Sequence, residues 1–457
     1  IFGEGAFNNA FLPIYAQSIE ARNPRAASSF ASRIITLMLI VQVALLVAAF
    51  LAMPAVVRLL APGFSNDPGR FALAVSLTRI TFPYLLCITL VTIYSGILNA
   101  HDRFTAAAAA PILLNLSMIA ALAVTFLFPN AGYAAAWGVT AAGFLQLGLV
   151  WAAARRAAIA PGVEAPRLDP VMRRFFRTLG PAVVGSAGVQ LAMFADTIIA
   201  SFLPTGAVSS LYYADRIYQL PLGVIGIAAG TVLLPEMSRR IAAGEPAAAY
   251  ATQNRTLGLT LALAAPFVVA FLVMPDLIMS AAFQRGVFDA AATQRAGAVL
   301  AAYAVGLPAA VLIRSAVSSF YARSDTLTPL IASLTAVAAN VALKIVLTGT
   351  HGVAGLALAT SIGAWVNLAL LFILALRRGW AAPDRGLYRS ALAVAIASLL
   401  LAGFAILAYG PFERWSLALP YWRTEILLGA LGACGAAVYA AALAAGLRLS
   451  GIRLARR

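Results

Sequence analysis

The segment FADTIIASFLPTGAVSSLYYADRIYQLPLG, residues 194–223, places three charged residues, Asp196, Asp215 and Arg216, within apolar sequence. Residues 203–206 (LPTG) predict a tight turn between two long apolar segments. At a helical rise of about 1.5 Å per residue, Arg216 lies roughly 15 Å beyond this turn, near the middle of a bilayer. A charge at that depth indicates either a functional site or an arginine paired with Asp215 or Asp196 that ties two helices together.

The composition around this segment is that of a membrane protein. The 457 residues are 62% hydrophobic and 11% charged, and the mean hydropathy is +0.91, which excludes a soluble globular protein. The alternating pattern of an outer-membrane barrel is absent, so we predict an all-α, polytopic helical fold. The net charge of +16 comes from arginines in short loops, where membrane orientation explains them better than nucleic-acid binding.

Thirteen apolar spans are expected, and the first is short. Residues 1–20 read as the end of a cavity-lining span, with Glu4 and Asn8 among apolar residues. Because the chain starts at Ile1 without a signal pattern, we expect a further helix to precede it. The other twelve spans are each long enough to cross a bilayer; they are 31–60, 71–98, 106–128, 132–154, 178–203, 207–234, 255–283, 296–321, 327–347, 352–376, 388–409 and 425–447.

Arginine distribution and an internal repeat predict the topology. Every second connection is rich in arginine, which places those loops and the C-terminus in the cytoplasm. Phe11-Leu12-Pro13 matches Leu233-Leu234-Pro235, and Pro24 matches Pro246 at the same sequence offset. Residues 99–103 and 321–325 occupy equivalent turns, again at this offset. We therefore expect two six-helix lobes related by a parallel pseudo-repeat.

These patterns set the expected domain boundaries. The N-lobe spans 1–159, a cytoplasmic linker spans 160–177, and the C-lobe spans 178–378. A C-terminal helix pair, 386–448, lies outside the repeat.

The candidate site is expected between the lobes, near the bilayer midplane. Arg216 can hold a phosphate or carboxylate with two parallel hydrogen bonds. Gln219 lies three residues further on the same helical face, and Asp196 and Asp215 are expected to orient the guanidinium or to contact substrate hydroxyls. Three other intramembrane charges, Arg79, Arg314 and Lys344, fit cavity lining, snorkelling or pairing within the bundle; for Lys344, the only lysine in the chain, snorkelling is favoured.

Irregular positions follow Arg216 along the same span. Pro221 and Gly223 fit either a hinge or an ordinary membrane-helix irregularity. Gly226 and Gly230 form a GxxxG spacing, which is typical of a close helix contact.

Enzyme signatures do not occur in the sequence. It contains no GxSxG, HExxH or GxxxxGK[ST] motif, and Cys87 and Cys434 lie in separate apolar segments, so neither catalysis, a metal nor a cofactor is predicted. A membrane transferase that uses a polyprenyl phosphate donor is the alternative from another class, but it requires a loop with paired carboxylates. A drug exporter is expected to carry acidic and aromatic cavity residues in place of arginine.

Several segments resemble the lipid II flippase (MurJ or MviN) family of the multidrug/oligosaccharidyl-lipid/polysaccharide (MOP) exporter superfamily. The resemblance rests on FGEGAFNNAFLPIYA (2–16), APGF (61–64), LTRITFPY (77–84), ILNAHDRF (97–104), the long match at 195–239 that contains LYYADR and LLPEMSR, FQRGVFDAAATQRA (283–296) and FYARSDTLTP (320–329). These segments cover both expected lobes in order. This sequence departs from the family pattern in one respect: the family's first helix and the arginine pair expected before Ile1 are not in it.

The resemblance implies a function and its partners. It implies a bacterial inner-membrane flippase that moves lipid II, the undecaprenyl-diphosphate-linked peptidoglycan precursor, to the periplasmic leaflet by alternating access. It further implies a cationic cavity in which Arg216 matches a family arginine and Glu4 an acidic residue, and a groove for the lipid tail beside the last two helices. Membrane lipids are expected partners, and no residue pattern specifies a coupling ion. The alternatives are export of another polyprenyl-linked oligosaccharide or of drugs.

Overall fold

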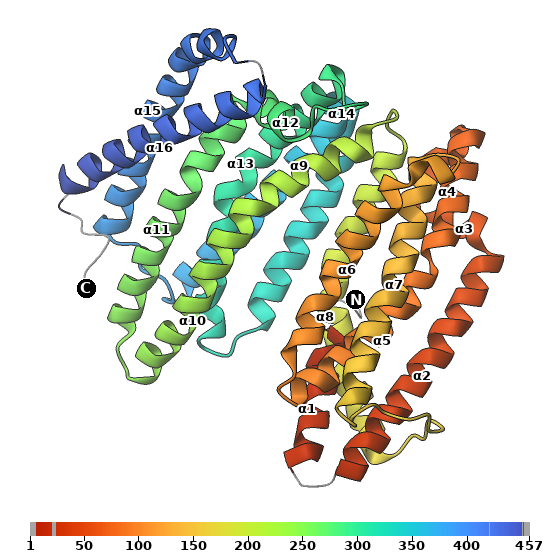
Figure 1. Cartoon of the computed structure of the whole chain (residues 1–457). Helices are drawn as coiled ribbons and strands as arrows, with labels where there is room; N and C mark the ends of the chain where they lie inside the picture. Colours follow the sequence, from red (N-terminus) through yellow and green to blue (C-terminus); the bar gives the residue numbers. More distant parts are fainter. Residues whose placement is uncertain (1–5, 21–23, 420, 450, 452–457) are drawn as a thin grey trace. The chain divides into compact units, whose positions relative to one another are not determined.

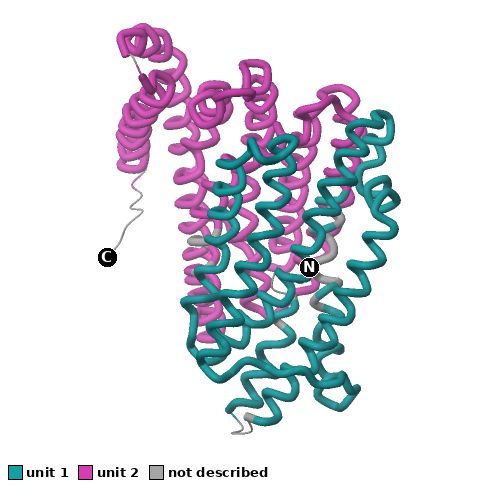
Figure 2. Tube along the Cα trace, turned by 45° about the vertical axis from the view of Figure 1, so that its right-hand side comes forward, with its two compact units in different colours: residues 1–194 teal, residues 195–457 magenta. Residues whose placement is uncertain are grey.

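All regular secondary structure in the described residues is helical, as the sequence predicts. The structure is a computed structural model that describes residues 6–20, 24–419, 421–449 and 451, and none of these residues lies in a strand. Two compact units divide the chain, residues 1–194 and 195–457 (Figure 2). The lobe and linker boundaries inferred from the sequence stay a prediction.

Unit 1 comprises the helices α1 to α7 and most of α8 (Figure 1). These are α1 (Ala6–Glu20), α2 (Pro24–Leu51), α3 (Met53–Leu60), α4 (Pro68–Thr81), α5 (Pro83–Ala100), α6 (Phe104–Ala123), α7 (Ala131–Arg156) and α8 (Pro170–Ser201), whose last residues belong to unit 2. An aromatic cluster joins α1, α2 and α8: the rings of Phe7 and Phe175 lie 5.7 Å apart, and those of Phe11 and Phe30 lie 5.6 Å apart. All four side chains are buried.

Unit 2 is built around helix α13. Its helices are α9 (Ala207–Pro221), α10 (Ile227–Ala242), α11 (Pro246–Val273), α12 (Pro275–Phe283), α13 (Ala290–Tyr321), α14 (Leu327–Arg377), α15 (Arg385–Ser416) and α16 (Arg423–Leu449). Helix α13 packs against α9, α10, α11, α12 and α14. Small residues permit this approach: a Cβ atom on Gly306 would lie 2.6 Å from the Cα atom of Ser361.

Prolines divide three of the predicted spans into two helices each. The spans 31–60, 71–98 and 255–283 are interrupted where Pro54, Pro83 and Pro275 begin α3, α5 and α12. Proline lacks an N–H group and has a fixed φ angle, so it fits the first turn of a helix and ends the one before it. Within the described residues, nine helices are long and apolar enough to cross a membrane.

The internal repeat extends to the ends of the helices. Helix α2 runs from Pro24 to Leu51 and α11 from Pro246 to Val273, so the sequence offset seen in the prolines holds at both ends. The turns after α5 and α13 have the same hydrogen bonds, because Arg103 N donates to Leu98 O at 2.9 Å and, at the equivalent positions, Asp325 N donates to Phe320 O at 3.0 Å. The pseudo-repeat predicted from a few prolines is thus present in the backbone.

Helix α14 contains two predicted spans joined at Gly352. This glycine has φ 55° and ψ −131°, outside the helical region, and it separates the spans predicted at 327–347 and 352–376. The two halves lie against each other, since a Cβ atom on Gly363 would lie 2.9 Å from the Cβ atom of Asn340. Glycine at 352 permits the positive φ angle, and glycine at 363 permits the close contact.

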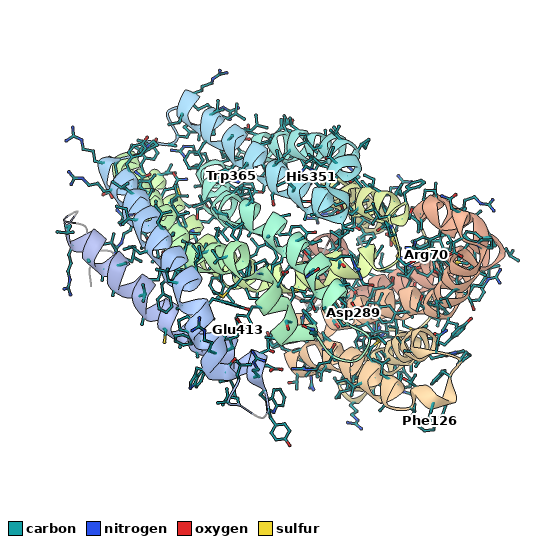
Figure 3. All side chains as sticks on the ribbon, turned by 90° about the horizontal axis from the view of Figure 1, so that it is seen from above. Arg70, Phe126, Asp289, His351, Trp365 and Glu413 are labelled. Carbon is teal, nitrogen blue, oxygen red and sulfur yellow. The ribbon has the colours of Figure 1, made fainter. Side chains whose placement is uncertain are left out.

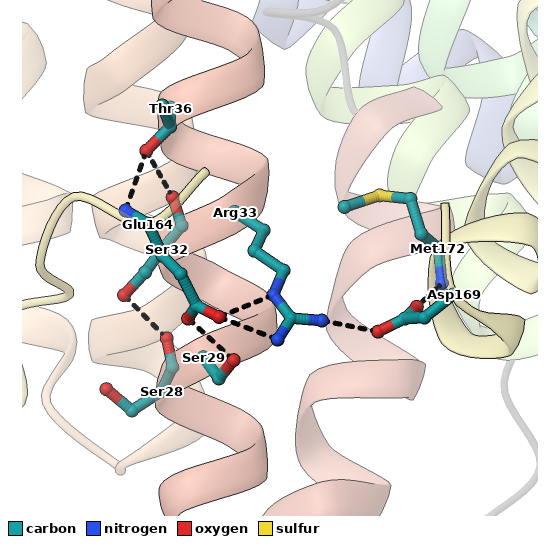
Figure 4. Close-up of polar contacts among 8 residues, drawn as sticks. All are labelled: Ser28, Ser29, Ser32, Arg33, Thr36, Glu164, Asp169 and Met172. Atoms are coloured by element: carbon teal, nitrogen blue, oxygen red, sulfur yellow. Dashed lines mark hydrogen bonds and ion pairs between the residues drawn. The ribbon is translucent and has the colours of Figure 1, made fainter. Parts of the chain in front are cut away.

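The segment between α7 and α8 is held by Arg33 of α2 (Figure 4). The Arg33 guanidinium lies 2.6 Å from a Glu164 carboxylate oxygen and 2.5 Å from Asp169. Ser29 donates a hydrogen bond of 2.6 Å to Glu164, and Asp169 caps α8 by accepting a bond from the Met172 N–H at 2.8 Å. The hydrogen bonds from Ser29 and then from Arg33 lower the pKa of Glu164 below its usual value.

We expect Arg33→Ala to release this segment, and trypsin to cleave after Arg167 several-fold faster than in the unchanged protein. Because the folded-state pKa of Glu164 is depressed, its contribution is present at neutral pH and is lost as the pH falls through that pKa. Glu164→Gln, which imitates the protonated carboxyl group at neutral pH, is therefore expected to act like Arg33→Ala. The control is Arg25→Ala, an exposed arginine of the same helix. An unchanged cleavage rate in both variants would show that Arg33 and Glu164 do not hold the segment between α7 and α8.

Candidate functional site

The segment that opened the sequence analysis forms the end of α8, a turn and α9. Gly206 has φ 93°, in the left-handed region, and Ala207 N donates to Pro204 O at 3.1 Å. The tight turn predicted at 203–206 is confirmed. Asp196 lies before the turn, and Asp215, Arg216 and Gln219 lie after it, all within unit 2.

Asp196 forms an ion pair with Lys344 of α14. Its carboxylate oxygen lies 2.5 Å from Lys344 Nζ, and the exposed side-chain fractions are 40% for Asp196 and 1% for Lys344. The preference for a snorkelling Lys344 was wrong, because its side chain is buried in the bundle. Asp196 was expected to hold the Arg216 guanidinium, but the structure pairs it with this lysine.

Arg216 stacks on an aromatic ring of its own helix. Its guanidinium carbon lies 4.7 Å from the centre of the Tyr212 ring, and the Arg216 residue is exposed. Gln219 donates a hydrogen bond to the Asp215 carboxylate one turn earlier, and Asp215 also interacts electrostatically with Arg216. Stacking restricts the plane of the guanidinium while its N–H groups remain able to bind an anion. This arrangement differs from an arginine that ties two helices together.

Two tyrosines connect α9 with α13 beside these charges. The rings of Tyr218 and Tyr303 stack at 5.0 Å, and Tyr303 interacts electrostatically with both Asp196 and Asp215. The two carboxylates, on α8 and α9, therefore border one polar region. Sequence reasoning missed both tyrosines, since tyrosine in a membrane helix is common and only packing brings these two together.

The repeat provides an internal comparison for the unit 2 charges. At the offset that relates α2 to α11, Lys344 corresponds to Leu122 and Arg314 to Thr92. Unit 1 thus forms the equivalent helices without either charge, so the helical framework does not require them. Lys344 stands out in the sequence in one way, since it is the single lysine among 32 basic residues.

A π-helical turn follows Pro221, where the sequence suggests a hinge or an irregularity. Residues Leu222–Gly226 form this turn, which is a common feature of functional helices. The expected glycine contact is present, because Cβ atoms on Gly226 and Gly230 would lie 3.5 and 3.9 Å from the Arg314 side chain of α13. The hinge motion itself stays a prediction.

Two candidate residues lie at the start of the chain. Glu4 is outside the described residues. Asn8 belongs to unit 1, on α1, where its buried Oδ1 atom has no hydrogen-bond partner among the residues that the structure describes and would lie 2.9 Å from a Cβ atom on Gly96 of α5.

Comparison with known proteins places these features in a family. A family model described as lipid II flippase MurJ matches residues 1–423. The chain belongs to the lipid II flippase MurJ family. It is 40% identical to a probable lipid II flippase MurJ of Rhizobium meliloti (strain 1021) over 453 residues, 98% of this chain and 84% of that protein. It is also 38% identical to a probable lipid II flippase MurJ of Rhizobium tropici, over 89% of this chain and 77% of that protein.

Solved structures agree with the fold. A lipid II flippase MurJ in an inward closed conformation matches with a TM-score of 0.77 at 22% identity, over 98% of this chain and 89% of that chain. An inward-facing MATE family multidrug transporter of the MOP superfamily matches with a TM-score of 0.69 at 15% identity, over 82% of this chain and 86% of that chain. The chain is thus a multi-pass membrane protein of a transporter family.

Proposed function

We propose that this protein carries lipid II from the cytoplasmic to the periplasmic leaflet of the bacterial inner membrane by alternating access. The match to the MurJ family over residues 1–423 supports the substrate class. The observation that carries the proposal at the level of residues is Arg216, an exposed guanidinium on α9, beside the carboxylates of Asp196 and Asp215. The protein makes and breaks no covalent bond, so it acts as a transporter and not as an enzyme.

The main physical obstacle is the diphosphate of the substrate. Moving such a group through hydrocarbon without its water is prohibitive unless the protein supplies replacement donors. Arg216 supplies two N–H groups in a fork that matches a phosphate, and its stacking on Tyr212 reduces the freedom lost on binding. We assign Arg216 the role of a hydrogen-bond donor to the diphosphate.

The neighbouring carboxylates must not repel this anion. Lys344 neutralises Asp196, and the Gln219 amide bonds to Asp215, which reduces the negative potential near Arg216. In this proposal Asp196, Asp215 and Gln219 position the cationic group or contact sugar hydroxyls. Glu4 and Asn8 stay proposed substrate-binding residues, and the buried Asn8 oxygen, which has no hydrogen-bond partner among the described residues, is able to accept a bond from a hydroxyl.

The C-terminal helix pair is assigned to the lipid tail. An apolar groove of about 270 Å³ lies between α11 and the pair α15 and α16, with Phe267, Leu401 and Leu431 among its lining residues. A polyprenyl chain fits such a surface because it offers no polar groups. The arginine-rich loops support a cytoplasmic C-terminus.

Growth of bacteria depleted of their own lipid II flippase tests the proposal. Expression of the protein in its complete natural form is expected to restore growth and to stop lipid II from accumulating in the cytoplasmic leaflet. If the protein reaches the membrane and lipid II still accumulates, the lipid II assignment is wrong. Accumulated lipid-linked sugars in the native host would then identify the transported oligosaccharide.

A further inference from the structure

Arg314 is a charged residue within α13, a helix that is long and apolar enough to cross a membrane. It is exposed and lies about 10 Å before the last residue of this helix, Tyr321. Within the described residues its guanidinium takes part in no ion pair, and only its backbone oxygen accepts a side-chain hydrogen bond, from Ser318. Unpaired charges inside a membrane are costly and usually face a polar path.

Helix α13 connects the two ends of unit 2. Figure 3 looks down on the end where the helix begins, with its N-cap Asp289 and Glu413 of α15 labelled. The turn after α13, residues 321–325, lies at the opposite end (Figure 1). This turn contains Arg323, and the arginine-rich loops are predicted to be cytoplasmic. Arg314 therefore lies in the half of α13 that is nearer to the predicted cytoplasmic surface.

Arg314 and Tyr303 lie on the same face of α13. They are separated by about three helical turns, or about 16 Å, so their side chains leave the helix in nearly the same direction. Tyr303 stacks on Tyr218 of α9 and interacts electrostatically with Asp196 and Asp215. The face of α13 that borders these carboxylates thus continues to Arg314.

Two glycines contact the apolar part of the Arg314 side chain, where the π-helical turn continues into α10. Cβ atoms on Gly226 and Gly230 would lie 3.5 Å from Arg314 Cγ and 3.9 Å from Arg314 Cβ. The aliphatic stem thus packs against this segment, and the residue as a whole remains exposed. The equivalent residue of the first repeat copy is Thr92, so helix packing does not require a charge at this position.

We propose that Arg314 is a second anion-binding residue of unit 2, which takes the diphosphate of the substrate on the cytoplasmic side before Arg216 does. Its role in transport rests on the proposed function, whereas anion binding by this guanidinium does not. Arg216 is close in sequence to Tyr218, which stacks on Tyr303, so the two arginines lie at levels about three turns apart. The two phosphates of a diphosphate share one oxygen atom and cannot reach both levels together. The anion therefore binds the two arginines one after the other.

The level of Arg314 shortens the path that the diphosphate crosses without a cationic donor. Measured from the predicted cytoplasmic end of α13, Arg314 is about 10 Å deep, and Tyr303, near the level of Arg216, is about 27 Å deep. An anion that has lost its water is unfavourable throughout the hydrocarbon region. A donor between the surface and Arg216 therefore lowers the barrier to entry.

Protection of a reporter cysteine by inorganic pyrophosphate tests the two levels separately. Ala310→Cys places the reporter one turn from Arg314 on the same side of α13, in a purified protein whose exposed Cys434 is replaced by Ala. We expect pyrophosphate to slow the reaction of this cysteine with a neutral maleimide about tenfold. Arg314→Ala is expected to remove the protection, whereas Arg216→Ala keeps it. Val305→Cys, an exposed position on the opposite face of α13, is the control, and its reaction does not depend on pyrophosphate.

Four results would overturn the proposal. Protection that persists in Arg314→Ala places the anion elsewhere, and protection that is also lost in Arg216→Ala shows one joint site in place of two. A reporter that does not react with the maleimide shows that this face of α13 is closed to water. Protection by phosphatidylglycerol in the bilayer, but not by soluble pyrophosphate, places Arg314 among the lipid headgroups.

Transport by the same variants separates this inference from the proposed function. Where the unchanged protein restores the growth of flippase-depleted bacteria, Arg314→Ala is expected to reduce lipid II transport about tenfold, and Arg314→Lys to reduce it less because the charge is kept. The control is Arg377→Ala, an exposed arginine at the end of α14 in the same unit. Normal transport in Arg314→Ala would remove Arg314 from the mechanism and leave the proposed function intact. Pyrophosphate protection without restored growth would refute the lipid II assignment and leave the anion site intact.

Discussion

Arg216→Ala is expected to abolish the growth of bacteria that depend on this protein for lipid II translocation, while membrane insertion is unchanged. The substitution removes two charge-assisted hydrogen bonds to the diphosphate, each worth about 1.5–3 kcal/mol. A loss of about 3 kcal/mol corresponds to a decrease of roughly 100-fold in transport. Because Arg216 is exposed and stacks on its own helix, its removal leaves no buried group without a partner.

Two further variants separate recognition from charge and from packing. Arg216→Lys keeps the charge but loses the planar fork, so we expect impaired growth; full activity would reduce the role of Arg216 to bulk charge. Arg58→Ala is the matched control, since Arg58 is also exposed and lies 5.7 Å from the centre of an aromatic ring, that of Phe71. Normal growth of the Arg216→Ala strain would remove this residue from the mechanism.

The second large effect concerns the buried ion pair, and it is expected to be asymmetric. Asp196→Asn leaves the ammonium of Lys344, which is 1% exposed, without its counter-charge, at a cost of about 3–5 kcal/mol. Lys344→Met leaves the Asp196 carboxylate, which is 40% exposed and thus less buried than Lys344, so its cost is expected to be smaller. The measurement is the thermal unfolding midpoint of each purified variant, together with its yield from the membrane.

The double variant Asp196→Asn, Lys344→Met completes this test. It removes both charges, so its stability is expected to return close to that of the unchanged protein, and the single effects do not add. Asp384→Asn provides a control for loss of a carboxylate, because Asp384 caps α15 by accepting a hydrogen bond from the Leu387 N–H, whereas Lys344 pairs with Asp196. Equal single effects that sum in the double variant would show that the two side chains do not act as a pair.

The repeat bears on the second of these predictions, because Lys344 has an uncharged counterpart in unit 1. Helices α2 and α11 begin and end at equivalent positions of the two copies, so this part of the framework is common to both. Lys344 and Arg314 replace Leu122 and Thr92 of the first copy. The helices of unit 1 form without these charges, so the helical framework does not require them and they are available for function. Lys344→Met removes one such charge.

Features that depend on neighbouring residues were predictable from the sequence alone. The helical class follows from apolar runs longer than a bilayer is thick, and the turn at 203–206 follows from its proline and glycine. Helix starts at Pro24 and Pro246 revealed the repeat because proline acts on its own backbone. The division of spans at Pro54, Pro83 and Pro275 follows the same local rule, but each span was predicted as one continuous helix.

The partners of the intramembrane charges were decided only by the tertiary structure. Asp196 and Lys344 are far apart in the sequence, and Arg216 was an equally reasonable partner for Asp196. One polar cavity of unit 2 likewise combines residues of α12, α15 and α16. The position of a residue within an apolar span indicates how deep it lies in the membrane, but a hydrogen bond needs atoms within about 3 Å. That proximity depends on which helix faces are packed together, because lipid and protein interiors are equally apolar and hydrophobicity does not select the partner.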